Sequence, residues 1–124
     1  NVEALSRLAT HPKITTCACD LESSVPWPFS DATFEAVIVT NYLFRPKLNA
    51  LFDLVADGGY LAYETFAVGN AAYGRPKNPD FLLNKGELTT KLSAQFEVID
   101  EFYGMVNTPT PAVIQRVAAR RKYV

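Results

Sequence analysis

Histidine and cysteine are scarce in this sequence, which has one histidine and two cysteines among its 124 residues. A triad with histidine as general base is not expected from His11 alone. A metal site is not expected either, because such sites draw several ligands from these residue types. Cys17 and Cys19 lie two residues apart, so on a strand they would share one face, a poor arrangement for a disulfide between them. We expect buried free thiols in a reducing cytoplasm.

An excess of basic charge and long apolar runs are also missing. The net charge of −1 gives no electrostatic footprint for nucleic acid, and no apolar run approaches the length that spans a bilayer. With 48% hydrophobic residues, the chain can build a packed core, and its length corresponds to one domain at most. We therefore expect a cytoplasmic protein that binds neither nucleic acid nor membranes.

The apolar pattern predicts alternating helices and strands. The run Phe34–Thr40 is typical of a central strand covered on both faces. A helix opens at Arg45-Pro46, and Gly58-Gly59 is expected to end it. A strand reached directly from that helix favours a parallel α/β order. The remaining expected elements are a helix end over 2–10, a strand over 13–20, a strand over 60–66, a long loop over 67–83, a helix from the capping pair Asn84 and Glu87 to about Ala94, and two final strands over 96–103 and 112–119.

The stretch 18–43 carries the most specific signal in the chain. It places an acid after a strand, a loop rich in proline and aromatics, and a second strand ending in polar residues, in the pattern formed by Asp20, Pro26, Phe29, Asp31, Phe34, Glu35 and Val37. This pattern resembles class I S-adenosylmethionine-dependent methyltransferases. The segment 54–65 looks like the family's helix–glycine–strand passage, and 64–83 resembles small bacterial members related to tellurite-resistance methyltransferases.

The resemblance implies an α/β fold that is the C-terminal portion of a Rossmann-like, seven-stranded methyltransferase domain. Its sheet is mostly parallel with a final antiparallel hairpin, in the strand order 3-2-1-4-5-7-6. The six glycines include no Gly-x-Gly, so the family's N-terminal cofactor loop and its first two strands have no counterpart, and residues 1–124 form a single, partial domain.

A gap of roughly 14 Å would then separate the strand numbered 3, over residues 13–20, from the strand numbered 4, over residues 34–40. Three outcomes are open: the strand over 13–20 relocates, two chains pair their sheet edges, or a segment has been cut away. We favour the last as the explanation of the sequence and a homodimer through exposed edges as the behaviour of the fragment.

Polar residues at the expected strand ends are the candidate cofactor ligands, because ligands of open α/β sheets bind there. The resemblance implies that Asp20 and Leu21 contact the adenine of S-adenosylmethionine; the alternative for Asp20 is capping a turn. Thr40 and Asn41 follow the strand expected beside the cofactor, and an asparagine there can also simply terminate a strand. Tyr42 is a candidate wall of the substrate pocket, or it packs on a neighbouring aromatic ring.

Glu64 is the best candidate for a general base, provided that burial raises its pKa; the alternative is a solvated or salt-bridged carboxylate. Tyr73 and Arg75 of the long loop are candidates for closing over an anionic or aromatic acceptor, and a loop with no role is the alternative. The function expected is methyl transfer to a small-molecule acceptor, by a fragment that is inactive alone. The alternative is a non-catalytic α/β module for oligomerisation or partner binding.

Overall fold

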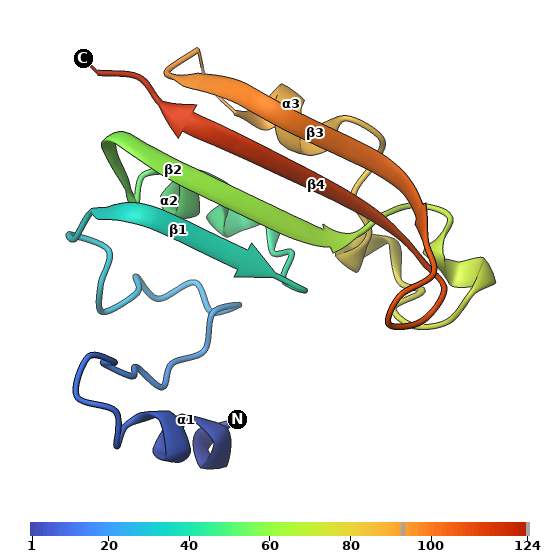
Figure 1. The fold of residues 1–124 in the computed structure, drawn as a ribbon. Coiled ribbons are helices and arrows are strands. Elements are labelled where there is room, and N and C mark those ends of the chain that lie inside the picture. Colours follow the sequence, from blue (N-terminus) through green and yellow to red (C-terminus); the bar gives the residue numbers. More distant parts are fainter. Residues whose placement is uncertain (93, 124) are drawn as a thin grey trace.

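The computed structural model describes residues 1–92 and 94–123, which form one mixed four-stranded sheet (Figure 1). The strands lie side by side in the order β1-β2-β4-β3. Their bounds are Phe34–Thr40 for β1, Val55–Phe66 for β2, Phe96–Val106 for β3 and Ala112–Arg121 for β4. The last strand of the chain therefore lies inside the sheet, between β2 and β3.

Three of the four strands run in the same direction. β1 and β2 are parallel, whereas β4 is antiparallel to both of its neighbours, β2 and β3. The expected final antiparallel hairpin is confirmed, and both of its strands extend beyond the expected bounds. The sheet is mixed, because β4 lies between β2 and β3 and makes two of the three neighbouring pairs antiparallel.

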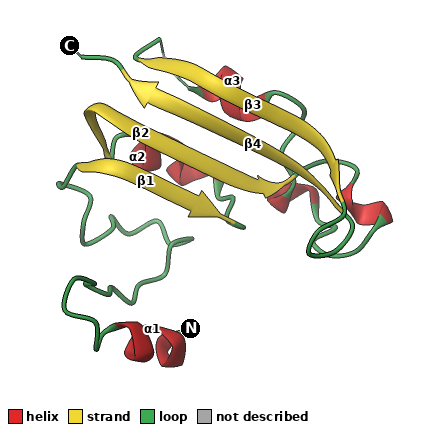
Figure 2. Ribbon diagram, viewed as in Figure 1, coloured by secondary structure: helices red, strands yellow, loops and turns green. Residues whose placement is uncertain are grey.

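The helices are short. Figure 2 shows α2 and α3 behind the same face of the sheet. The bounds are Val2–Leu8 for α1, Leu48–Phe52 for α2 and Glu87–Lys91 for α3, with 3₁₀ helices over Arg45–Lys47, Asn70–Ala72 and Pro79–Phe81. The helix expected over 2–10 is confirmed as α1, where the Asn1 side chain accepts a hydrogen bond from the Ala4 N–H at 3.2 Å.

The core lies between the sheet and the face that α2 and α3 cover. Leu61, Tyr63 and Val117 point into it from alternate positions of β2 and β4, and α2 and α3 contribute Leu48, Leu51, Phe52 and Leu88. The opposite face is open: Ile38 is 77% exposed and Tyr60 is 53% exposed. The expectation that 34–40 is a central strand covered on both faces is therefore wrong, because β1 is an edge strand and no other described element covers its outer face.

The strand expected over 13–20 is not formed. Residues 14–20 have no regular secondary structure, and Cys17 and Cys19 are free and exposed, so the expected burial of both thiols is also wrong. A strand needs a neighbour to pair its N–H and C=O groups. Within the described sheet this segment has none, because β1 pairs with β2 alone.

Gly58-Gly59 lies inside β2 and does not cap the preceding helix. α2 ends at Phe52, and the Phe34 N–H donates to the Leu54 carbonyl at 2.7 Å, so the chain has joined the sheet before the glycines. The register between β1 and β2 shifts here, and Gly58 takes a φ of +75°. The glycine pair therefore lies at the point where the pairing of β1 with β2 shifts register, near the start of β2.

The capping pair expected before α3 is formed only in part: Asn84 and Glu87 are hydrogen-bonded, but the N-cap of α3 is Gly86, and no side chain caps the helix. The Asn84 N–H donates to Glu87 Oε1 at 2.9 Å, and the Glu87 N–H donates to the Asn84 carbonyl at 3.0 Å. The helix ends at Lys91 and not near Ala94, because Leu92 already has an extended backbone.

Candidate functional site

Polar residues converge where β1 and β2 end. Thr40 and Glu64 are register partners, and the Asn41 N–H donates to the Glu64 carbonyl at 3.0 Å. Asn41 has a φ of 54°, a left-handed conformation that asparagine tolerates better than most residues. The chain thus leaves the sheet directly after Thr40, and three predicted site residues share one edge.

Two tyrosine hydroxyls connect the strand ends to the segment that carries Asp20. The Tyr42 hydroxyl donates to the Leu21 carbonyl at 2.7 Å, and the buried Tyr63 hydroxyl donates to the Tyr42 carbonyl. Burial, followed by the nearby Glu22 and Asp20 carboxylates, raises the pKa of Tyr42 to about 12. Tyr42 therefore stays protonated at neutral pH and holds Leu21 beside the end of β1.

A cleft of about 350 Å³ lies beside this connection. Its lining includes Leu21, Thr40 and Tyr42, together with the aromatic rings of Trp27 and Phe29. The two rings stack with their centroids 5.5 Å apart. Tyr42 thus lines a cleft of mainly apolar character.

Asp20 caps a turn. Its Oδ1 accepts the Glu22 N–H at 2.9 Å, which is the alternative that sequence reasoning left open. Asp20 and Leu21 also line a wide hollow of about 830 Å³, formed with Cys17, Cys19 and residues of α1. The Asp20 carboxylate is therefore oriented by its own turn.

Glu64 is ion-paired and partly exposed. Its Oε1 accepts hydrogen bonds from Arg116 Nε at 2.9 Å and Nη2 at 2.8 Å, and its side chain is 39% exposed. The burial that its role as a general base required is not present, and the salt-bridged alternative is the one observed. Glu64, Thr40 and Arg116 border a hollow of about 250 Å³ on the open face of the sheet, above Ala62 and Ala118.

Tyr73 and Arg75 are not brought to this group. Both are exposed residues of the loop over 67–83, and neither lines the clefts beside Thr40 and Tyr42. The loop is held at its base by Asn70, whose side-chain oxygen accepts the Val113 N–H at 3.0 Å and whose amide donates to the Pro76 carbonyl at 3.1 Å.

Arg45 is a residue that sequence reasoning missed. Its guanidinium donates from Nε and Nη2 to the two carboxylate oxygens of Glu87, at 2.7 and 2.9 Å. Three further hydrogen bonds of 2.8–3.3 Å reach backbone carbonyls at positions 79, 80 and 82. The hydrogen bonds from Arg45 hold the pKa of Glu87 down at about 2. The spacing of Asn84 and Glu87 predicted that the Glu87 carboxylate would accept a local hydrogen bond. No nearby residue in the sequence indicated that Arg45 would be its ion-pair partner.

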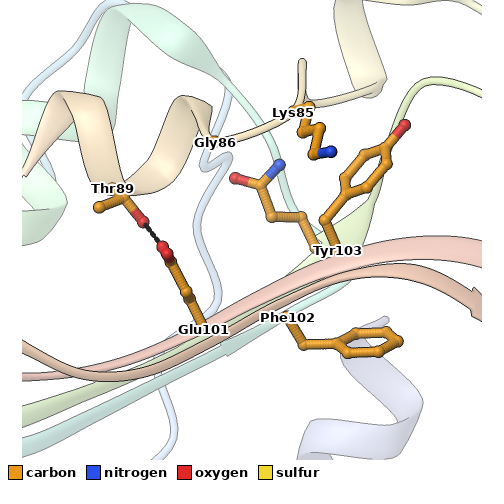
Figure 3. A pocket seen from close by; sticks show the side chains of 7 residues that line it. Lys85, Gly86, Thr89, Glu101, Phe102 and Tyr103 are labelled. Carbon is orange, nitrogen blue, oxygen red and sulfur yellow. Dashed lines mark hydrogen bonds between the residues drawn. The ribbon is translucent and has the colours of Figure 1, made fainter.

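Another hollow, of about 250 Å³, lies between α3 and the final hairpin. Figure 3 shows the side chains that line it. The Thr89 hydroxyl donates to Glu101, and the Lys85 ammonium lies 5.7 Å from the centroid of the Tyr103 ring. Thr89 and Glu101 thus bind each other, and Lys85 contacts the Tyr103 ring. None of the predicted site residues lines this hollow.

No three metal-ligating side chains gather at any point of the part of the chain that the structure describes. No described helix is both long enough and apolar enough to cross a membrane.

Comparison with known proteins identifies relatives by structure. No protein-family model and no curated protein matches the chain. Among solved structures, a SAM-dependent methyltransferase from Methanosarcina mazei aligns with a TM-score of 0.64 and 15% identity, covering all of this chain and 80% of that one. TehB from Haemophilus influenzae aligns with a TM-score of 0.56 and 14% identity over 79% of this chain. The chain spans about 40% of the length of TehB.

The identities of 14% and 15% support a statement about fold. The chain has an α/β fold with a mixed four-stranded sheet, similar to the fold of these two methyltransferases.

Proposed function

We propose that the chain takes part in S-adenosylmethionine-dependent methyl transfer to a small-molecule acceptor, as a relative of the small bacterial tellurite-resistance type. One observation carries the proposal: the hydrogen bond from the Tyr42 hydroxyl to the Leu21 carbonyl. It joins the Asp20-Leu21 segment to the ends of β1 and β2. The residues that the resemblance assigns to the cofactor thus form one connected group.

Methyl transfer from a sulfonium depends mainly on positioning, because the methyl carbon passes directly from sulfur to the acceptor atom. Asp20 and the Leu21 N–H receive the adenine, and Thr40 and Asn41 lie toward the reacting end of the cofactor. Glu64, which is ion-paired with Arg116, takes the proton that the acceptor releases. Tyr73 and Arg75 are assigned to acceptor contact only if the loop over 67–83 moves.

The test is isothermal titration with S-adenosylhomocysteine, the product of the cofactor. We expect measurable binding that Asp20→Asn weakens about tenfold, because a hydrogen bond to a charged group contributes about 1.5–3 kcal/mol. Asp31→Asn is the matched control, since Asp31 is an exposed aspartate of the same connection that lines none of the clefts beside β1. Equal binding by both variants would contradict the assignment of Asp20.

The second candidate is a non-catalytic association module. The open sheet face around Ile38 and Tyr60, together with the outer edge of β1, favours it. Native mass spectrometry with and without S-adenosylhomocysteine separates the two candidates. A liganded species, including a homodimer formed through sheet edges, supports the cofactor proposal. A dimer that never takes up ligand supports the association module.

A further inference from the structure

A second cleft, of about 470 Å³, lies beside the proposed cofactor group and has mainly apolar walls. It is formed by the connection after β1 and by the 3₁₀ helix Pro79–Phe81 of the long loop. Leu43 is buried, whereas the Phe81 ring remains 42% exposed at the mouth. The other apolar residues that line it are Phe44 and Pro46. Its volume suits a small molecule with one aromatic ring or a short aliphatic chain.

The charges around this cleft are unbalanced. Two carboxylates line it, Glu22 and Asp80, and its only lining cation is Arg45. The Arg45 guanidinium is already committed to Glu87 and to three backbone carbonyls. Lys47 lies close by in sequence, but its ammonium donates to the Val25 carbonyl at 2.8 Å and lies over the Trp27 ring. The lining of the cleft therefore carries two carboxylates and one guanidinium, and that guanidinium is paired with a third carboxylate, Glu87.

A ligand that complements both features has an apolar body and one positive charge. Aromatic rings attract a cation over their faces by about 0.5–1 kcal/mol at exposed sites, and Phe44 and Phe81 supply such rings beside the two carboxylates. An anionic ligand would meet repulsion from Glu22 and Asp80, with no available guanidinium to offset it.

We propose that this cleft binds a small apolar amine in its ammonium form, and that such an amine is the methyl acceptor. The second clause rests on the proposed function, whereas the binding preference does not. For transfer, the ammonium first loses a proton, which passes through water to Glu64, the proposed base outside this cleft. The nitrogen lone pair then forms the C–N bond while the C–S bond breaks, and that electron pair remains on sulfur as S-adenosylhomocysteine leaves.

The experiment uses three probes of the same shape and different charge, with no cofactor present. Benzylamine, benzyl alcohol and benzoate are titrated at pH 7 into the isotopically labelled chain, and amide chemical shifts are followed by NMR. We expect benzylamine to shift the amides of Leu43, Phe44 and Phe81 most strongly, benzyl alcohol to bind more weakly, and benzoate to leave them unchanged. Binding of benzoate as tight as that of benzylamine, or no shift at these amides up to millimolar concentrations, overturns the proposal.

A variant pair tests the charges themselves. The double variant Glu22→Gln/Asp80→Asn should weaken benzylamine binding about fivefold, as two exposed ion pairs would allow, and should leave benzyl alcohol binding unchanged. Asp31→Asn is the control for a nearby charge that does not line the cleft. Equal benzylamine affinity in the double variant and the control overturns the role of the carboxylates. S-adenosylhomocysteine binding without benzylamine binding overturns the amine cleft alone, and the reverse result overturns the proposed function alone.

Discussion

The ion pair between Arg45 and Glu87 makes the stability of the chain depend on pH in a calculable way. The Glu87 side chain is only 10% exposed and accepts both branches of the Arg45 fork. Its pKa falls from 4.5 to about 2 on folding, chiefly through the hydrogen bonds from Arg45. At about 1.4 kcal/mol per unit, this shift is worth about 3 kcal/mol.

The sign follows from the direction of the shift. A carboxylate whose pKa is lowered by folding contributes its full stabilisation above the unfolded value of 4.5, and loses it as the pH falls from 4.5 toward 2. Replacement by glutamine removes this titration and leaves the guanidinium with weaker acceptors. Glu87→Gln should therefore lower the free energy of unfolding by about 2–3 kcal/mol at pH 7, and the deficit should shrink as the pH approaches 3.

Urea unfolding between pH 7 and pH 3 measures both effects. Trp27 is the only tryptophan and is 5% exposed, so its fluorescence reports the transition. Glu97→Gln is the control, because Glu97 is an exposed carboxylate of β3 on the other side of the sheet from the Arg45 cluster. If Glu87→Gln and the unaltered chain lose the same free energy between pH 5 and pH 3, the assignment of the pKa shift to Glu87 is refuted.

Three further predictions concern other sites. Gln115→Ala should cost about 3 kcal/mol in urea unfolding, because the buried amide makes two hydrogen bonds that tie β4 to the start of α3. Gly58→Ala should lower the melting temperature, since its φ is +75° and the new Cβ would lie 2.5 Å from the Tyr123 ring; adding Tyr123→Ala should recover only the steric part. Arg116→Ala should change the free energy of unfolding by less than about 1 kcal/mol, because its pair with Glu64 is exposed to solvent and screened by salt; a larger loss would contradict that description.

Local patterns in the sequence predicted the elements whose causes are local. The apolar run 34–40 became β1 with the expected bounds, and the Asn84–Glu87 spacing produced a hydrogen bond from the Asn84 N–H to the Glu87 side chain at the start of α3. The segment 13–20 has strand-forming residues but no neighbouring strand to pair with, so its propensity had no effect. The glycine pair at 58–59 was misplaced for a related reason: pairing of Phe34 with Val55 draws the chain into the sheet earlier than the helical pattern indicates.

The candidate site was predictable only in part. Thr40, Asn41 and Glu64 could be placed together, because the carboxyl ends of neighbouring parallel strands share one edge. The bond from Tyr42 to Leu21 and the fork from Arg45 to Glu87 join residues 21 and 42 positions apart, and no spacing rule reaches so far. The ion pair of Glu64 could not be predicted either, because its partner Arg116 lies on a strand 52 residues later in the sequence.

The position of β4 sets the order in which the sheet can be completed on the ribosome. β4 is made after β3 but lies between β3 and β2, and β3 has no other neighbour in the described sheet. A nascent chain that has produced β1 to β3 can form the parallel pair β1–β2, but β3 then has no strand beside it, and the inner edge of β2 remains unpaired. Exposed strand edges of this kind invite pairing with other chains. The nascent chain is therefore most prone to aggregate with neighbouring chains just before residues 112–121 leave the ribosome.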